Sequence, residues 1–168
     1  EFAPDANPNP VVNRPAIVAI AYNAKGQKTE LTLGNGTVTR YTYDPENFRL
    51  TRLYTRRDAA WPGDCAGNPD AAEPARPCGV QNLRYTYDAV GNITHIRNDA
   101  QQTIWFRNSV VEPSCDYTYD ALNRLVEAKG REQAGVAGPP AIPEGPWPQG
   151  PMPSDRSLRR YTQRYEYD

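Results

Sequence analysis

Aspartates recur along this chain directly after tyrosine, and carboxylates are the first residues here that could do chemistry. Tyr-Asp pairs end at Asp44, Asp88 and Asp120, and paired carboxylates are the catalytic groups of most glycosidases. A catalytic site is normally built once, however, whereas these aspartates occupy the same place in a repeated phrase. An aspartate that begins a turn bonds backbone N–H groups two residues further on. We therefore assign the carboxylates to turns and expect no enzymatic activity.

Histidine and cysteine add little further chemistry. His95 is the only histidine, it lies in an alternating strand pattern typical of a sheet face, and no G-x-S-x-G is present. The three cysteines include no C-x-x-C pair and no cluster with histidine, so neither a metal site nor a cofactor is expected. Cys65 and Cys78 bracket a segment rich in proline, glycine and alanine. A disulfide between them is expected in an oxidising medium, and it would leave Cys115 free.

The phrase that carries the aspartates predicts a strand followed by a turn. It occurs as four Tyr-x-Tyr-Asp copies, preceded by a degenerate copy at Tyr22-Asn23. Side chains alternate along a strand, so the two tyrosines of a copy share one face. The aspartate then begins a turn in which glycine or asparagine takes the left-handed conformation. The residues assigned to this structural motif are Tyr41, Tyr43, Asp44, Tyr85, Tyr87, Asp88, Gly91, Asn92, Tyr117, Tyr119, Asp120, Asn123, Tyr165, Tyr167 and Asp168.

Return strands and further hairpins complete the predicted sheet. In the strand after Asn92, Ile93 is expected on the same side as His95. Phe48 is interpreted as a one-residue insertion that forms a bulge, and residues 32–38 and 98–106 each predict a hairpin. Residues 158–165 fit a strand but also one face of a helix. In all, about ten short antiparallel strands and little helix are expected.

Two loops interrupt the repeats. Residues 58–80 and 133–155 are rich in proline, glycine and alanine, and proline removes the N–H donor that a central strand needs. We therefore predict an irregular lead-in over 1–16 and a repeat segment over 17–168 with these two insertions. The Glu1-Phe2 start suggests a cut piece or a cloning remnant. The final Tyr-Glu-Tyr-Asp stops where a turn should begin, so truncation at the C-terminus is expected.

Composition excludes several classes of protein. The net charge of −1 argues against nucleic acid, whose binding needs clustered lysine and arginine. No run approaches the roughly 18 apolar residues of a membrane-spanning helix. Large aliphatic residues are few, and eleven tyrosines supply part of the missing apolar surface. A thin, ordered sheet without a deep aliphatic core is expected.

The repeated motifs resemble a known family. "YTYDAVGN", "YTYDALNRL" and "YEYD" are similar to the YD repeats of the Rhs family. The stretch from "IRNDAQQ" to "EAKGRE" resembles the B components of bacterial insecticidal Tc toxin complexes and related Rhs toxins. The resemblance covers residues 17–168 and implies an all-β fold, in which YD-repeat hairpins form a strip that spirals into a hollow shell around a C-terminal toxic enzyme. Teneurins carry a similar shell with a role in adhesion. The self-cleaving core region of the family has no match in this sequence. The resemblance is therefore to the wall of the shell only.

Two functions remain open from the sequence. The first is a non-catalytic wall segment of a secreted or cell-surface toxin-like protein, whose partners are neighbouring repeats and an enclosed toxin polypeptide. The second is a carbohydrate- or partner-binding module. Trp61 and Trp147 lie in the loops, where binding residues often occur, and they would contact glycans or pin the loops onto the sheet.

Overall fold

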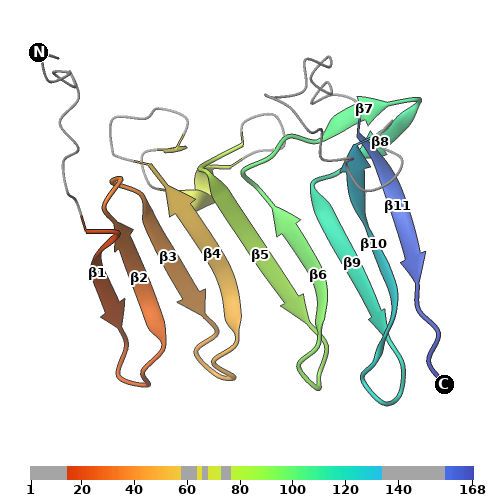
Figure 1. The fold of residues 1–168 in the computed structure, drawn as a ribbon, viewed down its shortest axis with the longest axis horizontal. Helices are drawn as coiled ribbons and strands as arrows, with labels where there is room; N and C mark the ends of the chain where they lie inside the picture. Colours follow the sequence, from red (N-terminus) through yellow and green to blue (C-terminus); the bar gives the residue numbers. More distant parts are fainter. Residues whose placement is uncertain (1–14, 58–63, 66–67, 73–76, 134–157) are drawn as a thin grey trace, which may run out of the picture.

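The chain folds into antiparallel β-structure, as predicted. In this computed structural model, residues 15–57, 64–65, 68–72, 77–133 and 158–168 are described. Neighbours along the chain pair side by side in one long sheet (Figure 1), ordered β1-β2-β3-β4-β5-β6-β9-β10-β11, and β7 and β8 form a separate hairpin. The strands are β1 (Ile17–Tyr22), β2 (Lys28–Leu33), β3 (Val38–Tyr43), β4 (Leu50–Arg56), β5 (Gln81–Tyr87), β6 (Ile93–Asn98), β7 (Ile104–Phe106), β8 (Ser109–Val111), β9 (Ser114–Tyr119), β10 (Leu125–Gln133) and β11 (Leu158–Arg164).

The two faces of the sheet differ in chemistry. Residues paired across neighbouring strands share a face, and side chains alternate along each strand. One face is uncharged over its middle, and we call it the tyrosine face. Its members are Ile20, Leu31, Tyr41, Leu53, Leu83, Tyr85, Ile96, Cys115, Tyr117, Ala128 and Tyr161. The opposite face, which we call the arginine face, holds Glu30, Arg40, Arg52, Tyr54, Asn82, Arg84, His95, Arg97, Ser114, Asp116, Lys129, Arg131 and Arg160.

A bulge recurs just after every turn of the repeat. Thr86 of β5 pairs with His95 of β6, and the next residue, Tyr87, pairs with Ile93, so Thr94 has no partner on β5. One residue is left unpaired in the same way in the other three hairpins. The bulge places Ile93 opposite Tyr87, on the tyrosine face. The expectation that Ile93 shares a side with His95 is therefore wrong, because an extra residue reverses the alternation.

Phe48 lies in a turn and not in the bulge, which corrects the interpretation made from the sequence. Its φ is 60°, and the turn runs from Asp44 to Arg49, one residue longer than the turn from Asp88 to Asn92. The bulge of this hairpin is at Thr51 instead, whose hydroxyl bonds the carbonyl of Thr42 at 3.1 Å. Phe48 takes the left-handed position that glycine or asparagine occupies in the other turns.

Two further hairpins were predicted, and one of them is displaced. Gly36 has a φ of 85° in the turn between β2 and β3, where the hairpin was expected. The hairpin expected at 98–106 instead spans Ile104–Val111 and turns at Arg107 and Asn108, both of which have positive φ. Residues 158–164 form a strand and not a helix, because they pair along β10.

Little of this sheet is fully buried. The buried apolar side chains are Tyr54, Cys78, Val111 and Ala128. At β1 every residue is exposed, since only one side of the strand is paired within the described residues. The sheet is thus a single layer, partly covered on its arginine face by the segments that follow β4 and β6.

Candidate functional site

Each aspartate of the repeat organises the turn that follows it. Asp88 Oδ1 accepts hydrogen bonds from the backbone N–H of Gly91 at 2.7 Å and of Asn92 at 2.8 Å. Gly91, with a φ of 112°, occupies the left-handed position, where a branched side chain would be strained. Asp44, Asp120 and Asn23 accept two backbone N–H groups each in the same way.

These hydrogen bonds keep the turn carboxylates ionised. The backbone N–H groups of Asn47 and Glu46 hold the pKa of Asp44 below its ordinary value of 3.8. For Asp88 burial acts to raise the pKa, but the amide of Asn92 and the surrounding N–H groups outweigh it, so this pKa too is lowered. Each carboxylate is bound by hydrogen bonds within its own turn.

The second tyrosine of each copy bonds the preceding repeat. Tyr87 donates from its hydroxyl to the backbone carbonyl of Leu50 at 2.8 Å. Leu50 is the first residue of β4 and faces Tyr43, the equivalent tyrosine one repeat earlier. The same bond joins Tyr43 to Lys28, Tyr119 to Ile93 and Tyr167 to Leu125, at 2.8 to 2.9 Å. We call this series of four bonds the tyrosine ladder.

The turns also contact one another in sequence. Gln27 donates from its side-chain amide to the carbonyl of Phe48 at 2.8 Å. Arg49 donates to the carbonyl of Asp88 at 2.8 Å, and its guanidinium lies 5.6 Å from the centre of the Tyr87 ring. Asn92 donates to the side-chain carbonyl of Asn123 at 2.9 Å. Each turn therefore helps to hold the next, and the repeats stack as a continuous row.

A partly buried charge cluster lies on the arginine face, with Arg52 and Asp99 at its buried centre. Arg52, Arg84 and Arg97 stand directly opposite one another across β4, β5 and β6, and like charges in that position repel. Asp99 lies among them, with its carboxylate 2.7 Å from Arg84 and 2.8 Å from Arg97. Asp70, in the 3-10 turn η2 (Pro69–Ala71), pairs with Arg52 and lies 3.2 Å from Arg84. The cluster binds the segment after β4 to the sheet.

The same segment is held by a disulfide and by Tyr54. Cys65 and Cys78 are disulfide-bonded with their Cα atoms 5.5 Å apart, and Cys115 is free. Tyr54 donates from its hydroxyl to the carbonyl of Asp64 at 2.6 Å. These contacts hold residues 64–65 and 68–72 against the arginine face.

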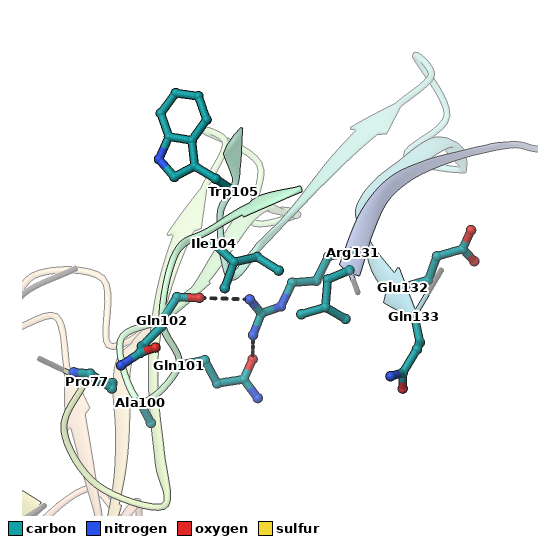
Figure 2. Close-up of a pocket in the computed structure, with 10 residues that line it drawn as sticks. Pro77, Ala100, Gln101, Gln102, Ile104, Trp105, Arg131, Glu132 and Gln133 are labelled. Atoms are coloured by element: carbon teal, nitrogen blue, oxygen red, sulfur yellow. Dashed lines mark hydrogen bonds between the residues drawn. The ribbon is translucent and has the colours of Figure 1, made fainter. Parts of the chain in front are cut away.

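An open cleft of about 920 Å³ lies between the β7–β8 hairpin and β10. Figure 2 shows Arg131 bonded to the carbonyl of Gln102 at 3.1 Å and to the side chain of Gln101. Trp105 is 74% exposed, and its indole points away from Arg131. Arg131 is thus engaged by Gln101 and Gln102, and Glu132 pairs with Arg159 at 2.7 Å. Within the described ranges, no three His, Cys, Asp or Glu side chains are placed to hold a metal ion.

Comparison with known proteins identifies the repeat. Residues 22–59, which hold the degenerate copy and the first full copy, match the family model described as RHS Repeat. The chain therefore carries an Rhs repeat. It is 42% identical over 153 residues to toxin subunit YenC2 of Yersinia entomophaga and 36% identical over 157 residues to toxin subunit YenC1 of the same organism. Each match covers 90% of this chain, and the chain spans 14% of the length of each relative.

Solved structures agree with this assignment. The crystal structure of TcdB2-TccC3 without its hypervariable C-terminal region is similar with 37% identity and a TM-score of 0.62. The Tc holotoxin pore of Photorhabdus luminescens is similar with 37% identity and a TM-score of 0.61. Each match covers 90% of this chain and 6% of the matched chain. The expected resemblance to Tc toxin components is confirmed.

The turns lie at one end of the strands, and the Rhs motif residues gather there. The second tyrosines and the aspartates lie at the contacts between repeats, whereas the first tyrosines extend across the tyrosine face. His95 lies on the arginine face, 2.7 Å from Asp116. Trp61 and Trp147, the residues considered for glycan contact, lie outside the described residues. In the described part of the chain, no helix is long and apolar enough to cross a membrane.

Sequence reasoning missed the charge cluster. It assigned no role to Arg52 or to Asp99, although their side chains are only 10% and 8% exposed. A signal was available, since arginines at matching strand positions of three adjacent strands must repel unless acids from elsewhere join them.

Proposed function

We propose that this chain is a non-catalytic wall segment of a Tc-toxin-like shell, which is part of a secreted protein and encloses a toxin polypeptide. The observation that carries the proposal is the tyrosine ladder. One hydrogen bond recurs between each repeat and the one before it, and nothing in that geometry limits the number of repeats. A wall needs such an open series, because it grows by adding the same unit to its edge.

The single layer also fits a wall. An enzyme site collects different residues at one place, whereas here the same residues recur at a regular spacing and are bound to their own turns. The relatives named as toxin subunits are several times longer than this chain, and the enclosed polypeptide would be supplied by the rest of the parent protein. We therefore place the partners of this segment among neighbouring repeats and that polypeptide.

Protease protection in the full-length parent protein tests the proposal. The double variant Tyr87→Ala/Asp88→Ala removes one ladder bond and the turn beside it. The matched control, Ala89→Ser/Val90→Ser, changes the two exposed residues that follow directly. The enclosed polypeptide should resist protease in the wild type and the control, and it should be cleaved in the double variant.

Two results would contradict the proposal. Cleavage of the polypeptide in the native wild type, at the rate seen in urea, would mean that nothing encloses it. Full protection in the double variant, together with an unchanged melting temperature, would mean that this repeat is no part of the wall.

A further inference from the structure

We propose that the tyrosine face lines the interior of the shell and lies against the enclosed polypeptide, while the arginine face points to bulk solvent. This orientation rests on the proposed function and adds to it which face of the wall points inward. A wall has two faces, and their chemistry in this chain is different enough to assign them.

The tyrosine face has the chemistry of a sheltered surface. Charges lie toward its two ends, where the ammonium of Lys28 is 4.7 Å from the centre of the Tyr41 ring and Arg159 pairs with Glu132 at 2.7 Å. Across its middle, the uncharged side chains of Tyr41, Leu53, Leu83, Tyr85 and Ile96 follow one another. All five are only half-buried. Contiguous apolar patches of this kind rarely face bulk water in soluble proteins and usually mark an interaction surface. A closed lumen would keep the patch from other molecules in solution.

The arginine face has the chemistry of an outer surface. It carries ion pairs along its length, among them Arg40 with Glu30 at 3.0 Å and Lys129 with Glu127 at 2.6 Å. Half-exposed pairs of this kind lose little by staying in water. Mixed charges also keep the surface soluble.

The segments that follow β4 and β6 support the same orientation of the wall. Asp64 and Pro69 contact Arg52, Tyr54 and Asn82, and the segment after β6 contacts Arg84 and Arg131. All five sheet residues belong to the arginine face. Insertions on the outside leave the lumen free, whereas insertions on the inside would occupy the volume meant for the polypeptide.

The tyrosine face therefore contacts the enclosed polypeptide without selecting one particular sequence. A polypeptide held before its release presents apolar side chains and both signs of charge. An uncharged face with tyrosine hydroxyls allows weak contact with all of them, and no ion pair fixes one sequence in place. The face would accept different polypeptides.

Adjacent residues of β11 provide a matched test. Thr162 pairs with Lys129 on the arginine face, and Gln163 pairs with Ala128 on the tyrosine face; both are exposed. Thr162→Cys and Gln163→Cys are each made in the full-length parent protein with Cys115→Ser, so that the introduced thiol is the reporter in this segment. Both proteins are treated with a maleimide on a polyethylene glycol chain too large to enter the shell.

The cysteine at position 162 should be labelled at least about tenfold faster than that at position 163, because labelling inside requires the wall to open. Equal labelling in urea is the control for intrinsic reactivity. Faster labelling at 163 would reverse the orientation while leaving the shell intact. Slow labelling at both positions would mean that a further layer covers the arginine face, which also overturns the inference. Fast labelling at both would contradict the shell itself.

Discussion

Tyr87 shows at the scale of one residue how the repeats are joined. Its hydroxyl bonds the carbonyl of Leu50, 37 residues earlier in the chain, and Tyr87→Phe would leave that carbonyl without this partner. A hydrogen bond of this type contributes about 1 kcal/mol net, so the variant should lower the free energy of unfolding by about that amount. Urea denaturation of the chain measures the change.

Tyr85→Phe is the matched control for that prediction. The ring of Tyr85 lies on the same face two residues away, and its hydroxyl has no hydrogen bond among the described residues. Removing it should change the free energy of unfolding by much less. Equal losses of unfolding free energy in the two variants would show that the hydrogen bond of Tyr87 stabilises the fold no more than a phenol hydroxyl without a protein partner does.

The turn aspartates predict a loss of stability in acid. The pKa values of Asp44, Asp88 and Asp120 are lowered in the fold. A carboxyl with a lowered pKa contributes stability that is present above its ordinary value of 3.8 and is lost as the pH falls through the folded value. The wild type should therefore lose stability below about pH 4. Asp88→Asn should show a shallower loss between pH 4 and pH 2, measured by urea denaturation at each pH; an identical pH dependence would contradict this role.

The sequence predicts the turns well but not the bonds between them. Asp88, Gly91 and Asn92 act on neighbours within four residues, so local chemistry decides their roles. The acceptor of Tyr87 is set by how one hairpin stacks on another, and the register depends on a bulge at Thr51 that no local signal marks. The sequence thus predicts the tyrosines as motif residues, without their partners.

At the scale of the element, acidic side chains offset the repulsion among the facing arginines of β4, β5 and β6. Asp99 is the buried member of the cluster, and Asp99→Asn would leave three facing guanidinium groups without their central counterion. Removing one partner from a fully buried pair typically costs about 3 kcal/mol or more, but Arg84 and Arg97 are nearly half exposed and water screens their charges, so the cost here should be about 1 to 3 kcal/mol. We expect a loss of that size in the free energy of unfolding, measured by urea denaturation.

Asp116→Asn is the control for this element. Asp116 pairs with His95 on the same face, but both side chains are considerably exposed, and an exposed pair contributes less than about 1 kcal/mol. If the two variants were equally destabilised, the cluster would be no stronger than an ordinary surface pair. The facing arginines signal that acids must join them, but the sequence does not show which acids, because Asp70 follows β4 and Asp99 follows β6, and only the folded sheet brings both to the same arginines.

At the scale of the whole molecule, the sheet ends in two strands that each have one unpaired edge within the described residues. Every residue of β1 is exposed, including Ile17, Val18 and Ile20. Open edges with apolar side chains recruit other strands. The isolated chain should therefore associate, and Ala19→Lys should reduce the association, because a charge in an edge strand opposes pairing.

Sedimentation of the isolated chain measures this association. Ala24→Lys, which places the same charge in the adjacent turn, should leave it unchanged. A monodisperse wild-type monomer that melts cooperatively above about 65 °C, the upper end for ordinary mesophile domains, would indicate a self-contained domain and argue against a wall segment.

The structure of the full-length parent protein tests the central claim most directly. If this segment is wall, β1 will pair on its second side with a strand of another repeat, and the hydroxyl of Tyr22 will donate to a backbone carbonyl of that repeat, as Tyr43 does to Lys28. Asp168 will begin another turn whose return strand pairs with β11. A determination by electron cryo-microscopy that instead leaves β1 and β11 as free edges, with Tyr22 in solvent, would contradict the account.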